Sequence, residues 1–203
     1  MPKKTFFNLP EDKKQSLVEA CRIEFSRVPL HEASISNMIK VCGISRGSFY
    51  QYFEDKEDAF YYLLKEKSKQ RQETFILFLK ETDGNIYEAV TKLFEVVMEE
   101  FEEEENRNFF KHVFLNMNHK IQNTFTNGET EDKFLQYLDD IKVHLDQSQF
   151  NTENDEEFYH AIHLIRMLMF NNIVRHFAKG LTKEEAMKNF TLELNLLKRG
   201  ISS

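Results

Sequence analysis

The chain has 203 residues, a formal net charge of −7 and 41% hydrophobic side chains, which is enough for a packed core in one or two domains. Few glycines and prolines, together with many Glu, Lys and Leu residues, predict a nearly all-helical protein. No apolar run is long enough for a membrane span, and the N-terminus has no secretory signal. We therefore expect a soluble, cytoplasmic protein with no membrane partner.

The first predicted helix begins near Pro10, with acidic residues in its first turn, and ends before Pro29. Its apolar residues recur at the helical spacing and should form its inner face. They are Leu17, Ala20, Cys21, Phe25 and Val28.

Residues 34–58 read SISNMIKVCGISRGSFYQYFEDKED and predict two short helices, joined by a glycine turn, and the start of a third helix. Ser34 is the expected N-cap of the first short helix, and Ser45 that of the second. Gly43 between them should adopt a left-handed conformation that ends the first helix. This order of elements is typical of a helix-turn-helix.

The second short helix combines small hydroxyl side chains with aromatic ones. Phe49 and Phe53 lie four residues apart and should face inward, leaving residues 50–52 on the other faces. Gly47 disfavours a helix by about 1 kcal/mol relative to alanine, but it would allow close approach of the backbone to a sugar or phosphate. The alternative, a core helix whose tyrosines only pack, gives no reason for the SRGS start.

The third helix should open with a capping pair, Asp55 and Asp58, and continue to about Leu79. The sequence Thr-Asp-Gly-Asn at residues 82–85 should end it. This helix would connect the N-terminal part of the chain to the remainder.

Through the motif GISRGSFYQYFEDKED, the chain resembles the TetR-type family of one-component bacterial transcriptional regulators, over about residues 10–65. Val41 and Cys42 stand where the family usually has small residues such as alanine. The resemblance implies an all-α fold with an N-terminal three-helix DNA-binding head and a C-terminal helical bundle for ligand binding and dimerisation. The expected divisions are residues 1–54 with the motif at 34–53, a connecting helix at 55–82, and the bundle at 83–203.

In this arrangement the partner of the head is a double-stranded DNA operator. Most contacts would be made to phosphates, and Gln51, with Arg46 as a second candidate, would read base edges. The expected DNA-binding residues are Ser34, Ser45, Arg46, Gly47, Ser48, Tyr50, Gln51, Tyr52 and Lys56.

The charge distribution predicts weak non-specific DNA binding. Residues 1–60 contain equal numbers of acidic and basic side chains, so all the excess negative charge lies in residues 61–203. The head can still present a basic face if its cations gather on one side. We therefore expect few phosphate contacts and a modest dependence of affinity on salt. The cations concerned are Lys3, Lys4, Lys13, Lys14, Arg46 and Lys56.

Beyond the connecting helix, the pattern predicts helices over residues 86–101, 108–115, 132–145 and 156–178, and a last helix that opens with a capping box at Thr182 and Glu185. The acidic run after Met98 should be a solvated helix end. The polar residues 147–155 should form a mobile loop.

Aromatic and methionine side chains of the middle helices would either line a cavity for a hydrophobic or amphipathic small-molecule effector or simply fill the core. Polar residues of the 156–178 helix would either orient that ligand or form hydrogen bonds between subunits. The candidate pocket residues are Phe94, Met98, Phe110, Phe114, Met117, Phe134, His163, Arg166 and Phe170.

The helix at residues 156–178 is apolar on more than one side and so should be buried on more than one side. The resemblance implies that it and the last helix pack against their copies in a twofold homodimer. Two heads roughly 34–36 Å apart would then read a near-palindromic operator. The candidate interface residues are Ile165, Met169, Ile173, Phe177, Phe190, Leu194 and Leu197.

We expect no enzymatic activity, because the sequence has no recognisable catalytic pattern or phosphate-binding loop. We expect no cofactor and no metal, since His160 and His163 lack a suitably spaced third ligand. The predicted function is a ligand-responsive transcriptional regulator, a repressor that a hydrophobic small molecule releases from its operator. The alternative is a helix-turn-helix adaptor with no DNA readout, which would not need Arg46 and Lys56 beside the tyrosines.

Overall fold

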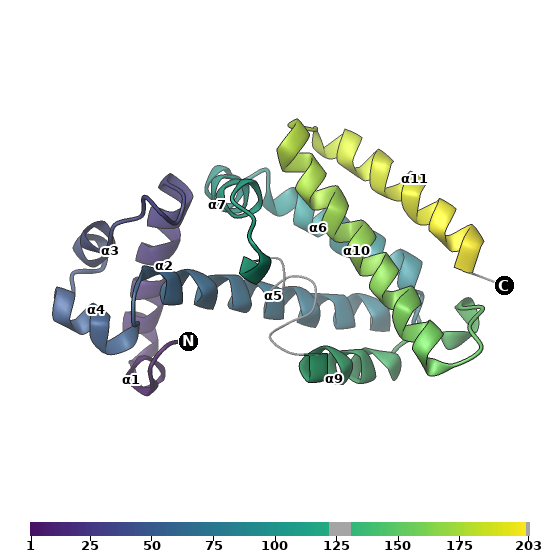
Figure 1. The fold of residues 1–203 in the computed structure, drawn as a ribbon, viewed down its shortest axis with the longest axis horizontal. Helices are drawn as coiled ribbons and strands as arrows, with labels where there is room; N and C mark the ends of the chain where they lie inside the picture. The colour runs from purple at the N-terminus through teal and green to yellow at the C-terminus, as the bar shows by residue number, and fades with distance from the viewer. Residues whose placement is uncertain (122–130, 202–203) are drawn as a thin grey trace. The chain divides into compact units, whose positions relative to one another are not determined.

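The structure, a computed structural model, describes residues 1–121 and 131–201, with the side chains of residues 131–136 and 201 left out. Within these residues all regular secondary structure is helical, as predicted (Figure 1). None of the helices described is long and apolar enough to cross a membrane. The elements are α1 (Lys4–Phe7), α2 (Glu11–Arg27), α3 (Ile35–Cys42), α4 (Arg46–Tyr52), α5 (Lys56–Glu81), α6 (Ile86–Glu100), α7 (Glu104–Leu115), α9 (Glu131–Lys142), η1 (Gln147–Gln149), α10 (Asp155–Lys179) and α11 (Lys183–Ile201).

The chain forms two compact units. The N-terminal unit contains residues 1–68 and 101–117, and the C-terminal unit contains residues 69–100 and 118–203. Helix α7 therefore belongs to the same compact unit as α1–α4, although we predicted it to be part of the domain at residues 83–203. The expected functional division at residues 54 and 82 stays a prediction.

Aromatic side chains fill the core of the N-terminal unit. The ring of Phe6 lies 5.0 Å from that of Phe53 and 4.9 Å from that of Tyr62, so α1 packs against the α4–α5 region. The sequence did not predict α1, because four residues are too few to show a helical period.

Helix α7 covers α2 and the start of α5 within the same unit. Ring centroids of Phe25 and Phe60 are 5.1 Å apart, and those of Phe60 and Phe109 are 5.9 Å apart. His112 Nδ1 lies 3.1 Å from the carbonyl oxygen of Phe25, near the C-terminal end of α2. These contacts make α7 part of the core that supports the first helices.

Glu24 of α2 is a buried carboxylate, 3% exposed, that joins α2 to the start of α3. It accepts hydrogen bonds from the Ser34 backbone N–H at 2.8 Å, from the Arg27 guanidinium at 2.8 and 3.0 Å, and from the Asn37 amide at 3.1 and 3.2 Å. Burial acts to raise the pKa of Glu24, but these donors together outweigh it and lower the pKa below its ordinary value.

The predicted capping role of the Ser34 hydroxyl is wrong. Ser34 occupies the N-cap position of α3, but its side chain makes no capping hydrogen bond. Its N–H instead donates to Glu24, so a carboxylate from the preceding helix satisfies the start of α3.

Residues 82–85 end α5 as predicted, with Asp83 at φ 49° and Gly84 at φ 81°. The prediction of a mobile loop at residues 147–155 is wrong for its first three residues, which form a short helix, and the turn just before them packs closely on Gly84. Asp146 N donates to the Gly84 carbonyl at 3.1 Å, and a Cβ on Gly84 would stand 2.5 Å from that nitrogen. Residues 147–149 form η1, and Phe150 after it is buried.

Two other helix boundaries differ from the predictions. The acidic run is not one helix end: α6 ends at Glu100 and α7 begins at Glu104, where acidic side chains suit the positive end of a helix. Helix α9 ends at Lys142, three residues before the predicted end. The capping box of α11 is present, with Thr182 Oγ1 accepting from Glu185 N at 3.2 Å and Glu185 Oε2 accepting from Thr182 N at 2.9 Å.

At pH 7 we expect Glu24→Gln to lower the free energy of unfolding by about 1–3 kcal/mol, because an amide replaces the charged acceptor of several buried donors. A carboxylate whose pKa falls on folding stabilises the protein at pH values above its pKa in the unfolded chain. This stabilisation is lost as the pH falls through its lower pKa in the folded protein. The difference between wild type and variant should therefore shrink below roughly pH 4. Urea unfolding at pH 7 and at acidic pH measures both effects.

Glu32→Gln is the matched control, because Glu32 is an exposed glutamate in the same connection between α2 and α3. Its effect should stay within about 0.5 kcal/mol at either pH. A Glu24→Gln protein as stable as wild type at pH 7 would refute the structural role of this carboxylate.

Candidate nucleic-acid interface

The helix-turn-helix forms as the sequence predicts. Gly43 ends α3 at φ 69°. Ser45 caps α4, since its Oγ accepts from the Ser48 backbone N–H at 3.0 Å. Phe49 and Phe53 are buried in the unit core, which turns the opposite side of α4 outward. On that side Tyr50 and Gln51 are exposed, while the neighbouring tyrosine at position 52 is half-buried.

Arg46 and Tyr50 form a polar cluster on the exposed side of α4. The guanidinium of Arg46 donates to Tyr50 Oη at 3.3 Å and to Ser36 Oγ of α3 at 3.4 Å. Its Cζ atom lies 5.8 Å from the centre of the Tyr50 ring. The cluster presents a cation and hydroxyl groups on one surface, which suits phosphate oxygens and base acceptors. The sequence did not point to Ser36, because its link to Arg46 exists only in the folded helix pair.

Two predicted contact residues also have structural roles. Lys56 Nζ donates to the carbonyl oxygens of His31 and Ala33 at 2.8 and 3.0 Å, which ties the start of α5 to the α2–α3 connection. These bonds leave one of its three N–H donors for another acceptor. The Ser48 hydroxyl lies 2.9 Å from that of Ser45, within the cap of α4.

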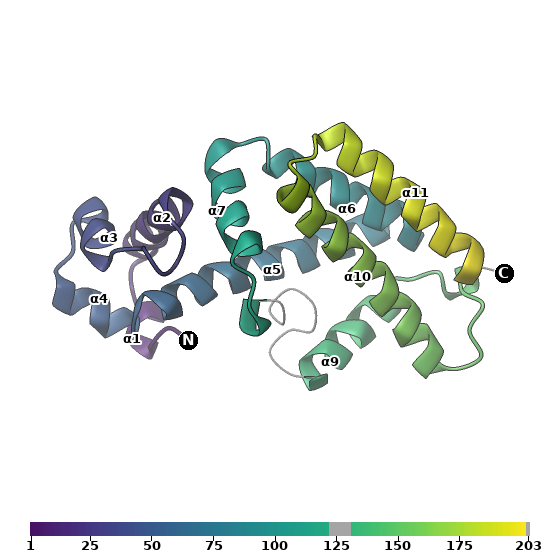
Figure 2. The ribbon, with the colours of Figure 1, turned by 45° about the horizontal axis from the view of Figure 1, so that its top comes forward.

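The C-terminal end of α4 lies beside α1 (Figures 1 and 2). We call residues 3–7 the N-terminal arm. Lys3 donates from its backbone N–H to the Tyr52 carbonyl at 2.9 Å and from its ammonium to the Tyr50 carbonyl at 2.8 Å. The Thr5 hydroxyl donates to the Gln51 carbonyl. The sequence indicated only a basic face for Lys3 and gave no sign of a role for Thr5.

In the C-terminal unit, α10 and α11 run side by side in opposite directions (Figure 1). Four of the residues predicted for the dimer interface are buried in their own chain, namely Ile165, Ile173, Phe190 and Leu194, and so offer little area to a second subunit. Phe190, for example, stacks on Phe94 at 4.1 Å between ring centroids. Met169, Phe177 and Leu197 are half-buried.

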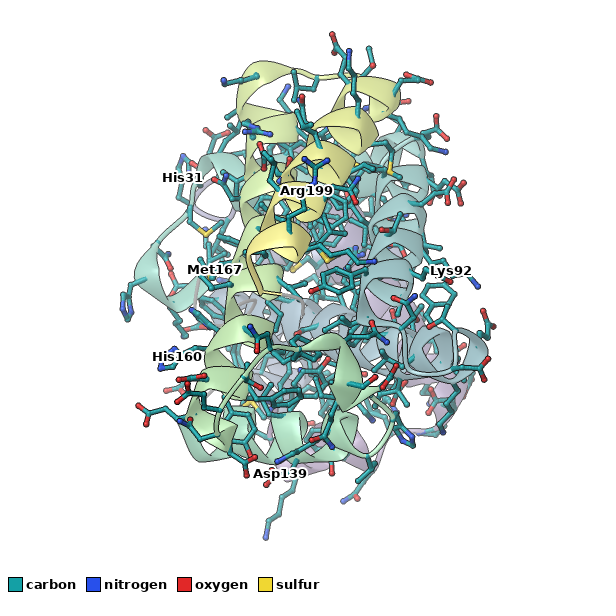
Figure 3. All side chains as sticks on the ribbon, turned by 90° about the vertical axis from the view of Figure 1, so that its right-hand side faces the viewer. His31, Lys92, Asp139, His160, Met167 and Arg199 are labelled. Carbon is teal, nitrogen blue, oxygen red and sulfur yellow. The ribbon has the colours of Figure 1, made fainter. Side chains whose placement is uncertain are left out.

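The sequence pattern showed that α10 and α11 have more apolar surface than one contact needs, but it did not show which side packs within the chain. Among the described side chains of this helix pair, the large apolar ones that are exposed are instead Leu164 on α10 and Leu192 and Leu196 on α11. On these helices the polar side chains of His160 and Arg199 project outward (Figure 3).

Two polar residues of α10 form hydrogen bonds within their own subunit. Asn172 donates to Glu193 of α11 at 2.8 Å, and Arg175 donates to Glu193 at 2.7 Å and to Asn172 at 2.8 Å. Burial acts to raise the pKa of Glu193, but the hydrogen bonds from these two side chains lower it overall. These residues therefore join α10 to α11.

The predicted pocket residues are divided between the two compact units. Phe110, Phe114 and Met117 belong to the N-terminal unit, where the rings of Phe110 and Phe114 stack at 6.0 Å. Phe134 lies outside the side chains that the structure describes. The remaining candidates belong to the C-terminal unit and are Phe94, Met98, His163, Arg166 and Phe170.

Arg166 gives the C-terminal unit a half-buried cation beside an aromatic ring. Its Cζ lies 5.5 Å from the centre of the Tyr137 ring. Burial lowers the pKa of Arg166 and raises that of Tyr137 to about 12. Among the described residues, no group of three or more His, Cys, Asp or Glu side chains is placed to hold a metal ion.

Comparison with known protein families agrees with this architecture. The family described as "Bacterial regulatory proteins, tetR family" matches residues 17–61, and the one described as "Tetracyclin repressor-like, C-terminal domain" matches residues 85–201. The chain belongs to the TetR family of transcriptional regulators. No curated protein matches it in sequence.

Solved structures of TetR-family transcriptional regulators share the fold. One from Streptomyces coelicolor is 17% identical, with a TM-score of 0.65 over 93% of this chain and 81% of its own. One from Pectobacterium atrosepticum is 15% identical, with a TM-score of 0.63 and 95% of each chain covered. SmeT, the repressor of the Stenotrophomonas maltophilia multidrug efflux pump SmeDEF, is 12% identical, with a TM-score of 0.60 over 95% of this chain and 93% of its own.

Gly47 offers a test of close DNA approach, because the folded chain itself does not need a glycine there. A Cβ on Gly47 would meet no atom closer than Ser45 Oγ, at 3.7 Å. We expect Gly47→Ala to raise stability by up to about 1 kcal/mol through helix propensity. It should nevertheless weaken DNA binding, because the added methyl would separate the backbone from the duplex. Thermal unfolding and DNA titration measure the two effects, and unchanged DNA affinity would contradict a close approach.

Proposed function

We propose that this protein is a ligand-responsive repressor that binds a near-palindromic DNA operator as a homodimer and is released by a hydrophobic or amphipathic small molecule. The observation that carries the DNA-binding part is the outward side of α4. A capped helix holds Arg46, Tyr50 and Gln51 on one exposed surface, while Phe49 and Phe53 fix its opposite side in the core.

Within this proposal the contacts differ in role. Arg46 and Tyr50 hold phosphates and so position the helix, with Gly47 allowing close approach. Gln51 reads a base, since a glutamine amide can both donate to and accept from an adenine edge in the major groove. Ser34, Ser45, Ser48, Tyr52 and Lys56 remain candidate contacts at the margins of this surface.

We expect few cations near this surface to contact phosphates directly. Lys3 and Lys56 already donate to backbone carbonyls, and Lys14 pairs with Glu11 at 2.9 Å. Since each phosphate contact by a cation adds to the salt dependence of binding, affinity should vary only modestly with salt. Specific contacts would then supply much of the preference for the operator.

The proposed ligand response uses the chain path between the two units. Residues 86–100, which form α6, belong to the C-terminal unit, and the chain continues directly into α7, which packs on α2 in the N-terminal unit. A ligand that shifts α6 would therefore act on the support of the helix-turn-helix through α7. For a tenfold change in DNA affinity, its binding must favour one state by roughly 1.4 kcal/mol.

The proposed homodimer uses the exposed side of α10 and α11. Leu164, Leu192 and Leu196 expose apolar area that a second copy of the same helix pair would cover. A twofold axis there would place the same surface on both subunits, as dimer symmetry requires.

The DNA-binding proposal is tested by selecting bound fragments from a random DNA pool and measuring variants on the selected site. Tyr50→Ala should weaken binding to every sequence, because a phosphate contact carries no sequence information. Gln51→Ala should relax the preference at one operator position, by about 1–3 kcal/mol of discrimination. Equal losses on the selected site and on random duplex for Gln51→Ala would refute its reading role.

The dimer proposal is tested by placing charges on the exposed leucines. The double variant Leu192→Asp/Leu196→Asp should sediment as a monomer, because the contact would bury four uncompensated carboxylates across the twofold axis. Leu77→Asp is the control, since Leu77 on α5 is 58% exposed and Leu196 is 57% exposed. A double variant that remains dimeric, or a wild type that is monomeric, would contradict the proposed interface.

A further inference from the structure

Helix α4 has an unusual way of satisfying its C-terminal carbonyl groups. The last four carbonyls of a helix have no partner inside the helix, and here they belong to residues 49–52. The Phe49 carbonyl accepts from Phe53 N at 2.9 Å. The other three carbonyls accept from the N-terminal arm: Tyr50 from the Lys3 ammonium, Gln51 from the Thr5 hydroxyl, and Tyr52 from the Lys3 backbone N–H.

The arm also supplies a charge that α4 lacks. A cation near the C-terminal end of a helix is favourable because the macrodipole is negative there, yet α4 has no basic residue in its last turn. The Lys3 ammonium, 2.8 Å from the Tyr50 carbonyl, takes this place from a distant part of the chain. The arm is anchored by Phe6, which is fully buried against Phe53 and Tyr62.

Gln51 is the residue whose position this arrangement fixes most directly. Its side chain is exposed, whereas its own carbonyl and the carbonyls on either side of it are all bound by the arm. Because α4 has only seven residues, its last turn would otherwise fray, and the Gln51 side chain would then sample many directions.

We propose that the N-terminal arm sets the sequence selectivity of DNA binding by holding the last turn of α4, with Lys3 and Thr5 as positioning residues for Gln51. This inference rests on the proposed function. The arm affects base reading through the helix backbone and does not itself need to touch a base.

The first experiment compares Thr5→Val with Thr5→Ser in the full-length protein. Valine keeps the shape of threonine but loses the hydroxyl donor, whereas serine keeps the donor. The ratio of affinities for the selected site and for random duplex should fall about fivefold or more in Thr5→Val, which corresponds to weakening one base contact. Thr5→Ser should keep the wild-type ratio. A variant that is merely less stable would lose binding to both DNAs alike and leave the ratio unchanged.

The second experiment compares Lys3→Met with Lys4→Met, which remove the same charge from adjacent positions. Lys4 is exposed and has no ion pair among the described residues. Relative to Lys4→Met, Lys3→Met should lower the affinity ratio while the salt dependence of binding is the same in both. If Lys3 acted as a phosphate contact, binding to all sequences would weaken and the salt slope would fall by about one.

Hydrogen exchange without DNA separates the positioning step from the DNA-binding proposal. Amides near the end of α4 should lose protection in Thr5→Val and in Lys3→Met, but not in Thr5→Ser or Lys4→Met. Unchanged protection would overturn the role of the arm, as would an unchanged affinity ratio in a protein that binds its selected site. A wild type that selects no DNA sequence would instead refute the proposed function, and with it the reading role of the arm.

Discussion

A helix of seven residues is too short to be stable by itself in water, so α4 depends on contacts outside it. Ser45 satisfies its first turn, the N-terminal arm satisfies its last turn, and Phe49 and Phe53 hold one side in the core. The side of α4 that carries Tyr50 and Gln51 is left exposed. The presentation of these side chains is therefore a property of the whole N-terminal unit.

The same dependence extends one helix further back. Helix α3 begins on the carboxylate of Glu24, and α2, which supplies that carboxylate, is covered by α7. A chain of contacts thus leads from α7 through α2 and α3 to α4. The first link joins helices that are far apart in the sequence, α2 and α7, and it makes the orientation of the helix-turn-helix sensitive to changes in a distant helix.

Local features were predictable from the sequence, because a cap or a turn is determined by a few neighbouring residues. Gly43, Ser45 and the Thr182–Glu185 capping box all form as expected. Features that depend on distant partners were missed, including the arm on α4 and the acceptance of the Ser34 N–H by a carboxylate ten residues earlier. Periodicity also failed to show which apolar sides of α10 and α11 pack within the chain, because both sides have suitable residues. The contact residues for DNA and ligand stay predictions.

The position of α7 bears on how such a protein can be divided. A fragment that stops at the end of α5 keeps the whole helix-turn-helix motif but omits residues 101–117, which complete the same compact unit. Phe60 would then lose the cover of Phe109 and expose apolar surface, and the Phe25 carbonyl would lose its contact with His112. Hybrid regulators that exchange recognition modules at this boundary would thus combine one protein's α2 with another protein's α7, and the two would have to be matched.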